Sequence, residues 1–251
     1  MKKRRKGIGF WLCLVGVVVL CLVFSGCCEK PDKASWTQDH VTEVPPILMR
    51  DPFLELLGQT DKPIPYTYEE AVKLAGHSCG AVAGAWIITR KALEALYPDG
   101  IPERGEIVIE APGAEDEWIV GVFGEVMTYV TGASPKTGFP GGPFGKGYRR
   151  RNLLNYKEEA AHTPPAEMVW VFRRSDTGAQ VGVQYDLSLV QPPGTPERSK
   201  MAAKLARGEA TPEEAGEWVD YWNARVRFIF ENADTLKGLF TVTDLGTAKV
   251  Y

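Results

Sequence analysis

Gly76-His77-Ser78-Cys79-Gly80 is the stretch around which the rest of the sequence can be organised. A helical pattern at residues 81–97 follows it directly, so a thiol and an imidazole lie at a predicted helix N-terminus, where unpaired N–H groups favour negative charge. Thiolate and imidazole are also the usual ligands of zinc and other soft or borderline metals. The alternative interpretation is a buried structural cysteine beside a solvated histidine.

The first residues of the chain have the pattern of an export signal. A basic start at residues 2–6 is followed by an uncharged apolar run at residues 8–24 and then by Ser25-Gly26-Cys27. This order resembles a bacterial lipoprotein signal in which Cys27 is acylated, and an uncleaved membrane anchor is the alternative. Both interpretations place the rest of the chain outside the cytoplasm, because the basic flank stays inside. We therefore predict a cell-envelope protein held at the membrane by a lipid on Cys27.

The cysteines support a special role for Cys79. The chain has five cysteines, and all but Cys79 belong to the signal or to the membrane attachment. The folded part therefore cannot form an internal disulfide, and a lone thiol in an oxidising compartment needs either burial or a metal. This modestly favours a ligand role for Cys79.

Composition indicates three segments: a signal at residues 1–26, a tether at residues 27–65, and a globular domain at residues 66–251. The tether is rich in proline, charge and polar residues, and His40 within it is expected to be solvated. Apolar residues at 47–49 and 52–57 are expected to dock on the domain, the latter as a short helix.

The order of expected elements predicts an α+β fold with helices packed on a mixed or antiparallel sheet. Capping boxes at Thr67 with Glu70 and at Thr211 with Glu214 mark two helix starts, and Gly132 marks a helix end. Trp218, Trp222, Val226 and Phe230 recur every four residues, which is typical of core packing. We expect helices at 67–74, 81–97, 118–130, 197–207 and 211–232, and strands at 106–110, 168–173, 180–189 and 239–245.

Several stretches together resemble the E-subunit family of formylmethanofuran dehydrogenase, over just under half of the chain. They are Gly76 to Gly80, the helix with Gly84, residues 126–132 ending in Thr-Gly, Phe144-Gly145-Lys146-Gly147 with Asn152-Leu153, and residues 171–178 with Arg173-Arg174 and Asp176-Thr177-Gly178. The resemblance implies an α+β fold of the kind shared with the catalytic domain of glyceraldehyde-3-phosphate dehydrogenase. It also implies a divalent metal, with zinc as the first candidate, at His77 and Cys79.

The sequence departs from the family pattern where the family often has a further cysteine and an aspartate. The aspartate position falls on Glu125, and a carboxylate can replace a lost thiolate, so Glu125 is the candidate third ligand. The resemblance also places Lys146 beside the His77–Cys79 turn, where its charge would favour a thiolate and an anionic cofactor or cargo. A flexible surface loop with a solvated lysine is the equal alternative.

These observations predict an exported metal- or metallocofactor-binding protein that takes a metal or a small molecule as cargo. The alternatives are a cysteine-dependent or metal-dependent enzyme, with His77 or His162 as the base, and an accessory component of an envelope redox complex. A formal net charge of −3, with no basic face identifiable in the sequence, gives no support for nucleic acid as a partner, and none is expected. The oligomeric state, including a homodimer, is left open.

Overall fold

A computed structural model of the chain describes residues 36–143, 145, 147–158, 168–190 and 196–249. The chain divides into two compact units, Met1–Thr37 and Gln38–Tyr251, and the second unit holds all the elements described below. These elements are η1 (Asp39–Val41), β1 (Ile47–Met49), α2 (Pro52–Leu56), β2 (Ile64–Tyr66), α3 (Tyr68–Ala75), α4 (Gly80–Leu96), β3 (Ile107–Glu110), α5 (Val120–Thr131), β4 (Leu154–Asn155), β5 (Val169–Arg174), β6 (Ala179–Tyr185), η3 (Leu187–Leu189), α6 (Pro196–Ala206), α7 (Pro212–Asn232) and β7 (Phe240–Thr247).

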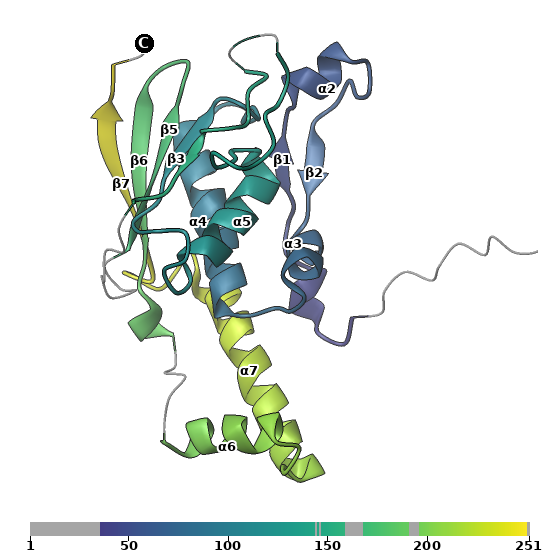
Figure 1. Ribbon diagram of the computed structural model, residues 1–251. Coiled ribbons are helices and arrows are strands. Elements are labelled where there is room, and N and C mark those ends of the chain that lie inside the picture. Colours follow the sequence, from purple (N-terminus) through teal and green to yellow (C-terminus); the bar gives the residue numbers. More distant parts are fainter. Residues whose placement is uncertain (1–35, 144, 146, 159–167, 191–195, 250–251) are drawn as a thin grey trace, which may run out of the picture. The chain divides into compact units, whose positions relative to one another are not determined.

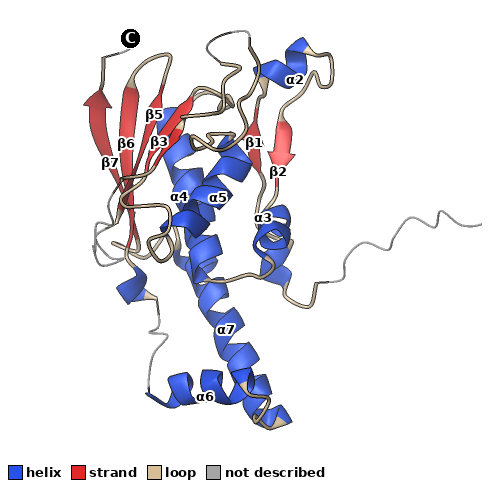
Figure 2. Cartoon of the chain, viewed as in Figure 1, coloured by secondary structure: helices blue, strands red, loops and turns tan. Residues whose placement is uncertain are grey.

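A five-stranded sheet in the order β4-β3-β5-β6-β7 forms one layer, and α4 and α5 pack on one of its faces (Figure 1). Strands β3 and β4 are parallel, and the other neighbouring strands are antiparallel. Figure 2 shows α4 and α5 beside this sheet, and α2 and α3 near the small antiparallel sheet of β1 and β2. The predicted α+β class with a mixed sheet is therefore confirmed. The closer resemblance of the fold to the E-subunit of formylmethanofuran dehydrogenase stays a prediction.

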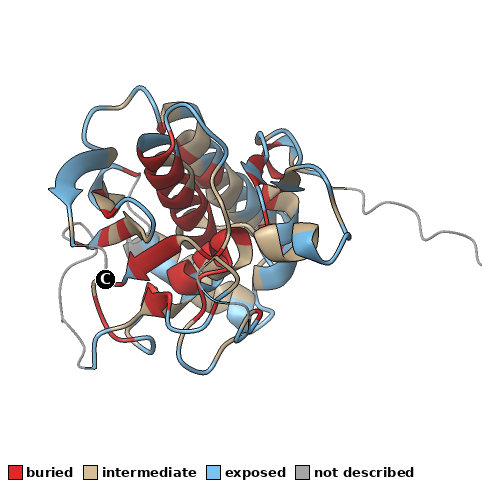
Figure 3. Ribbon diagram, turned by 90° about the horizontal axis from the view of Figure 1, so that it is seen from above, coloured by how far each residue is buried: buried red, intermediate tan, exposed pale blue. Residues whose placement is uncertain are grey.

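The core lies where α4 and α5 meet the sheet (Figure 3). Trp86 of α4 and Trp170 and Phe172 of β5 are completely buried. Trp170 stacks on Phe123 of α5, with ring centroids 5.9 Å apart. Gly84 lets α4 approach β6 closely, because the Tyr185 ring occupies the space where a Cβ would be. This packing fixes the direction of α4 and hence the positions of both of its ends.

The predicted helix ends are largely those of the structure. Thr67 and Thr211 form reciprocal capping boxes with Glu70 and Glu214, and Gly132 ends α5 in the left-handed conformation. These signals were readable because each depends on residues within four positions of one another. Among the described residues, no helix has both the length and the apolar character that crossing a membrane requires.

The sequence predicted a tether up to residue 65, but the folded unit begins at Gln38. Strand β1 pairs with β2, and Met49 is completely buried. Asp51 caps α2 and binds Arg150 at 2.7 Å, and both side chains are buried. The expectation that residues 47–49 dock and that 52–57 contain a short helix is confirmed. His40, predicted to be solvated, is only 6 % exposed, because α3 and α7 pack around η1.

Helix α7 differs from its predicted role as a core helix. Only its second half is buried, at Val226 and Ile229, whereas Trp218 and Trp222 are part-exposed. The first half of α7 and all of α6 extend away from the sheet (Figure 1). The aromatic stripe therefore continues past the core and reaches the turn that carries His77 and Cys79.

Candidate functional site

Three elements hold the middle residue of the turn between α3 and α4. The Ser78 carbonyl oxygen accepts a hydrogen bond from Trp222 Nε1 of α7 at 2.7 Å. The Ser78 hydroxyl shares hydrogen bonds with the Tyr68 hydroxyl of α3 at 2.8 Å and with His40 Nε2 of η1 at 3.4 Å. A turn tied to three elements through its central residue has little freedom, so the residues on either side of Ser78 are held in fixed positions.

His77 lies on the outer side of this turn and is exposed. Its Nδ1 is 3.2 Å from the carbonyl oxygen of Ala75. Because a carbonyl oxygen can only accept, Nδ1 carries the proton in this contact, and Nε2 is the nitrogen that can offer a lone pair to a metal. A backbone carbonyl on Nδ1–H is a common way to orient a histidine that binds a metal through its other nitrogen.

Cys79 is the N-cap residue of α4 and is part-exposed. Its side chain makes no capping hydrogen bond, and it is the one free cysteine among the described residues. Tyr68 and Tyr185 lie nearby, and Tyr185 donates to the Gly80 carbonyl at 3.5 Å. Burial raises the pKa of both tyrosines, and Cys79 raises it further, so both hydroxyls are neutral donors at neutral pH.

Glu125 does not lie with these two residues. It is exposed on α5, and its charge contributes to raising the pKa of Tyr156, beside β4. Within the described part of the chain, no three His, Cys, Asp or Glu side chains are grouped so that they could hold a metal ion. The structure thus supplies two neighbouring donors, His77 and Cys79, and an open zinc site usually takes three from the protein.

The other predicted site residues fall outside the described residues: Cys27, Lys146 and His162. The residues beside Lys146 can be placed. Gly145 and Gly147 both have positive φ, and the Gly147 carbonyl accepts from Arg150 Nη1 at 3.3 Å and lies against Gly105, shortly before β3. The placement of Lys146 beside Cys79 stays a prediction.

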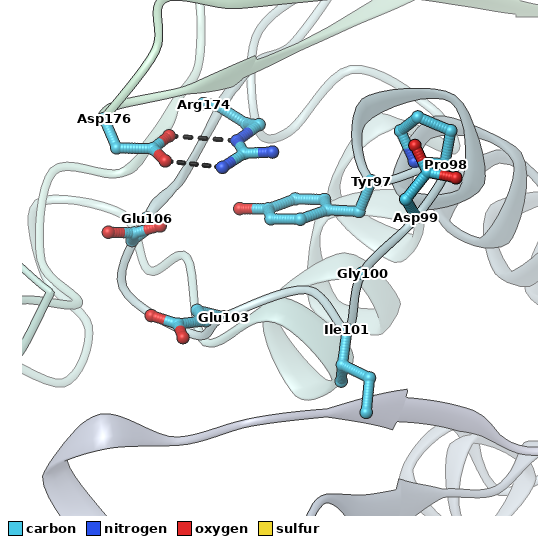
Figure 4. A pocket seen from close by; sticks show the side chains of 9 residues that line it. All are labelled: Tyr97, Pro98, Asp99, Gly100, Ile101, Glu103, Glu106, Arg174 and Asp176. Atoms are coloured by element: carbon cyan, nitrogen blue, oxygen red, sulfur yellow. Dashed lines mark hydrogen bonds and ion pairs between the residues drawn. The ribbon is translucent and has the colours of Figure 1, made fainter.

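A pocket of about 540 Å³ lies at the other end of α4, where the chain leaves the helix (Figure 4). Arg174 of β5 lies over the Tyr97 ring, with the guanidinium carbon 4.0 Å from the ring centroid, and it donates to the Leu96 carbonyl at 3.1 Å. It also binds Asp176 through two hydrogen bonds of 2.9 and 2.5 Å. The pocket is lined by Tyr97, Pro98, Asp99, Gly100, Ile101, Glu103, Glu106, Arg174 and Asp176.

The pocket has an excess of negative charge. Burial raises the pKa of Glu106, the carboxylates of Asp176 and Glu103 raise it further, and Arg174 opposes them. Sequence reasoning missed this pocket because its residues come from the α4–β3 loop and the β5–β6 hairpin, which are distant in the chain. The only local signal was the hairpin pattern at Asp176-Thr177-Gly178.

A second cavity, of about 530 Å³, lies between η1, α4 and α7. His40 lines it, and the Nδ1 atom of His40 is buried with no hydrogen-bond partner among the described residues. Arg90, Arg227, Asp39, Glu43 and Glu231 also line this cavity. It is joined to the turn through the contact between His40 and Ser78.

No model of a known protein family matches this chain, and no curated protein matches it.

Proposed function

We propose that this chain is a metal- or metallocofactor-binding protein of the cell envelope, attached to the membrane by a lipid on Cys27, with His77 and Cys79 as its protein ligands. The observation that carries the proposal is the turn around Ser78. It holds an imidazole and a free thiol at the surface two residues apart, and it leaves the Nε2 lone pair of His77 available. Membership of the E-subunit family of formylmethanofuran dehydrogenase is part of this proposal, supported by the sequence stretches and by the α+β class.

The donor set favours a soft or borderline divalent metal, with zinc first. Two protein donors do not complete a zinc site, so the remaining ligands would come from water or from the cargo itself. Glu125 is left out of the ligand set, because it is exposed on α5 near Tyr156. A site that is open in this way suits a protein that takes up a metal or a small metal complex and releases it.

We do not extend the proposal to catalysis by Cys79. A nucleophilic cysteine needs a base within hydrogen-bond reach of the thiol. Among the described residues, no hydrogen bond joins the Cys79 thiol to His77, and His162 lies outside those residues. The geometry of the turn therefore favours binding of a metal over activation of the thiol.

Metal content of purified full-length variants tests the proposal. The wild-type protein, dialysed against Zn²⁺ and then against metal-free buffer, should keep zinc that Cys79→Ala and His77→Ala proteins lose. Co²⁺ loading should give a thiolate-to-metal charge-transfer band that disappears in Cys79→Ala. Glu125→Gln is the matched control, and it should keep the wild-type metal content. Unchanged zinc in both ligand variants would show that the proposal is wrong.

A further inference from the structure

The pocket at the C-terminal end of α4 is a second place where the molecule can bind a ligand. It is separated from Cys79 by the whole of α4, which has 17 residues and is therefore about 25 Å long. The carbonyl groups at a helix C-terminus carry partial negative charge. The pocket adds four carboxylates to this end of the helix, from Asp99, Glu103, Glu106 and Asp176, against one arginine.

The cations of the molecule neutralise only part of this charge. Arg174 is committed to Asp176 and to the Leu96 carbonyl, and Arg50 binds Glu103 at 3.0 Å. Glu106 has neither a hydrogen bond to its carboxylate nor an ion pair within the described residues, although it is part-buried. The raised pKa of Glu106 has the same origin, since burial and neighbouring carboxylates both disfavour its charged form. A cation placed beside Glu106 would remove this penalty.

The Tyr97 side chain provides an independent observation. Tyr97 is only 8 % exposed and its hydroxyl is buried. The backbone N–H of Glu103 approaches the hydroxyl oxygen, but no hydrogen bond of good geometry reaches it from the described residues. Figure 4 shows this hydroxyl pointing toward the space between Arg174, Glu103 and Glu106. Buried hydroxyls are normally hydrogen-bonded, because leaving one unsatisfied costs free energy. A buried hydroxyl without a well-formed hydrogen bond, aimed toward the unpaired Glu106 carboxylate, indicates that a donor from outside the chain completes the group.

We propose that this pocket binds a small organic cation through its primary ammonium group. An ammonium group has three N–H donors, and the pocket offers it as acceptors the Glu106 carboxylate, the Tyr97 hydroxyl oxygen and the Glu103 oxygen that Arg50 does not bind. Ile101, which is 39 % exposed, and Pro98 provide apolar contact for an aliphatic body. The volume lies within the range of small-molecule sites. The carboxylates are not grouped closely enough to hold a metal ion.

Titration of the detergent-solubilised full-length protein with n-butylamine and with 1,5-diaminopentane tests this proposal, with n-butanol as the uncharged probe. Heats of binding should give a saturable isotherm for the two amines and none for n-butanol. Glu106→Gln should weaken amine binding by roughly tenfold or more, and Tyr97→Phe, which keeps the ring beneath Arg174, by roughly threefold to tenfold. Glu110→Gln changes an exposed carboxylate at the far end of β3 and should bind as the wild type does.

The outcomes are distinct from those of the metal test. A protein carrying both His77→Ala and Cys79→Ala should bind the amines with unchanged affinity, because α4 separates the two sites. Equal amine affinity in wild type, Glu106→Gln and Tyr97→Phe would overturn the proposal. So would saturable binding of Ca²⁺ at this pocket without any binding of the amines. Glu106→Gln removes a carboxylate whose charge is disfavoured by burial and by neighbouring carboxylates, so this variant is expected to fold.

Discussion

His40 shows how one buried residue can make the stability of the turn depend on pH. Burial lowers its pKa from the ordinary value of 6.5, the positive charge of Arg227 lowers it further, and Asp39 partly opposes this. The cavity beside it also holds Arg90, Glu43 and Glu231. In the folded protein His40 is therefore neutral over a pH range in which the unfolded chain already binds a proton.

We predict that the protein loses stability as the pH falls below about 6.5, and that His40 causes part of this loss. The lowered pKa means that the unfolded state binds more protons than the folded state in this range, so stability rises with pH there. Thermal unfolding midpoints measured from pH 7.5 to pH 5 should fall less steeply for His40→Gln than for the wild type. His77→Gln, at an exposed position, is the control. Parallel curves for His40→Gln and the wild type would contradict the prediction.

At the scale of single elements, α4 is defined by how closely it approaches the sheet. Gly84 is a poor helix former, but a Cβ at this position would overlap the ring of Tyr185. That ring is 2 % exposed and stacks on Phe240 with centroids 4.6 Å apart, so it has no space into which to move. The packing of α4 against β6 therefore requires glycine at position 84, even though glycine is unfavourable inside a helix.

Two glycine-to-alanine substitutions should therefore have opposite effects. Gly84→Ala should lower the free energy of unfolding by about 1–3 kcal/mol, the usual cost of overpacking a core. Gly216→Ala in the exposed first half of α7, where a new Cβ meets no atom within 4 Å, should raise it by about 0.5–1 kcal/mol. Urea unfolding of the two variants measures both effects. A stabilising Gly84→Ala would show that α4 is not fixed in place by Tyr185.

The elements that the sequence predicted well are those whose signals are local. The capping boxes at Thr67 and Thr211 each involve two residues three positions apart. Strands β1 and β2 have three residues each, and β2 contains Pro65, so neither has a recognisable pattern without its partner. The first half of α7 was predicted to be buried but is not. Its aromatic residues indicate an apolar face, but the sequence does not show which element, if any, covers that face.

The same distinction applies to the candidate sites. His77 and Cys79 are two residues apart and were readable as a pair. The support of their turn by Tyr68, His40 and Trp222 depends on contacts between α3, η1 and α7, which no local pattern encodes. The pocket brings Tyr97 together with Arg174 and Asp176, which are distant in the chain. The pairing of β3 with β5 places them side by side, so the pocket can be recognised only in the assembled sheet.

At the scale of the whole molecule, the boundary of the folded unit decides which residues are needed for stability. The unit begins at Gln38, so residues 38–65 belong to it. In this segment, Asp51 Oδ1 lies 2.7 Å from Arg150 Nη2, and Asp51 Oδ2 lies 3.8 Å from Arg104 Nε. Arg150 is buried, with 7 % of its surface exposed. Removing one partner of a buried ion pair leaves an uncompensated charge, which typically costs about 3–5 kcal/mol.

We therefore predict that a protein beginning at residue 66 does not fold stably, whereas one beginning at Gln38 does. The shorter protein loses Asp51, the buried Met49 and the pairing of β1 with β2. The combined loss is comparable to the whole stability of a typical domain, about 5–15 kcal/mol. Circular dichroism should show a cooperative thermal transition for residues 38–251 and none for residues 66–251. Asp51→Ala in the full-length chain isolates the contribution of the ion pair, and it should lower the unfolding midpoint. A cooperative transition at the same temperature in both truncated proteins would instead make residues 38–65 a tether that merely rests on the domain.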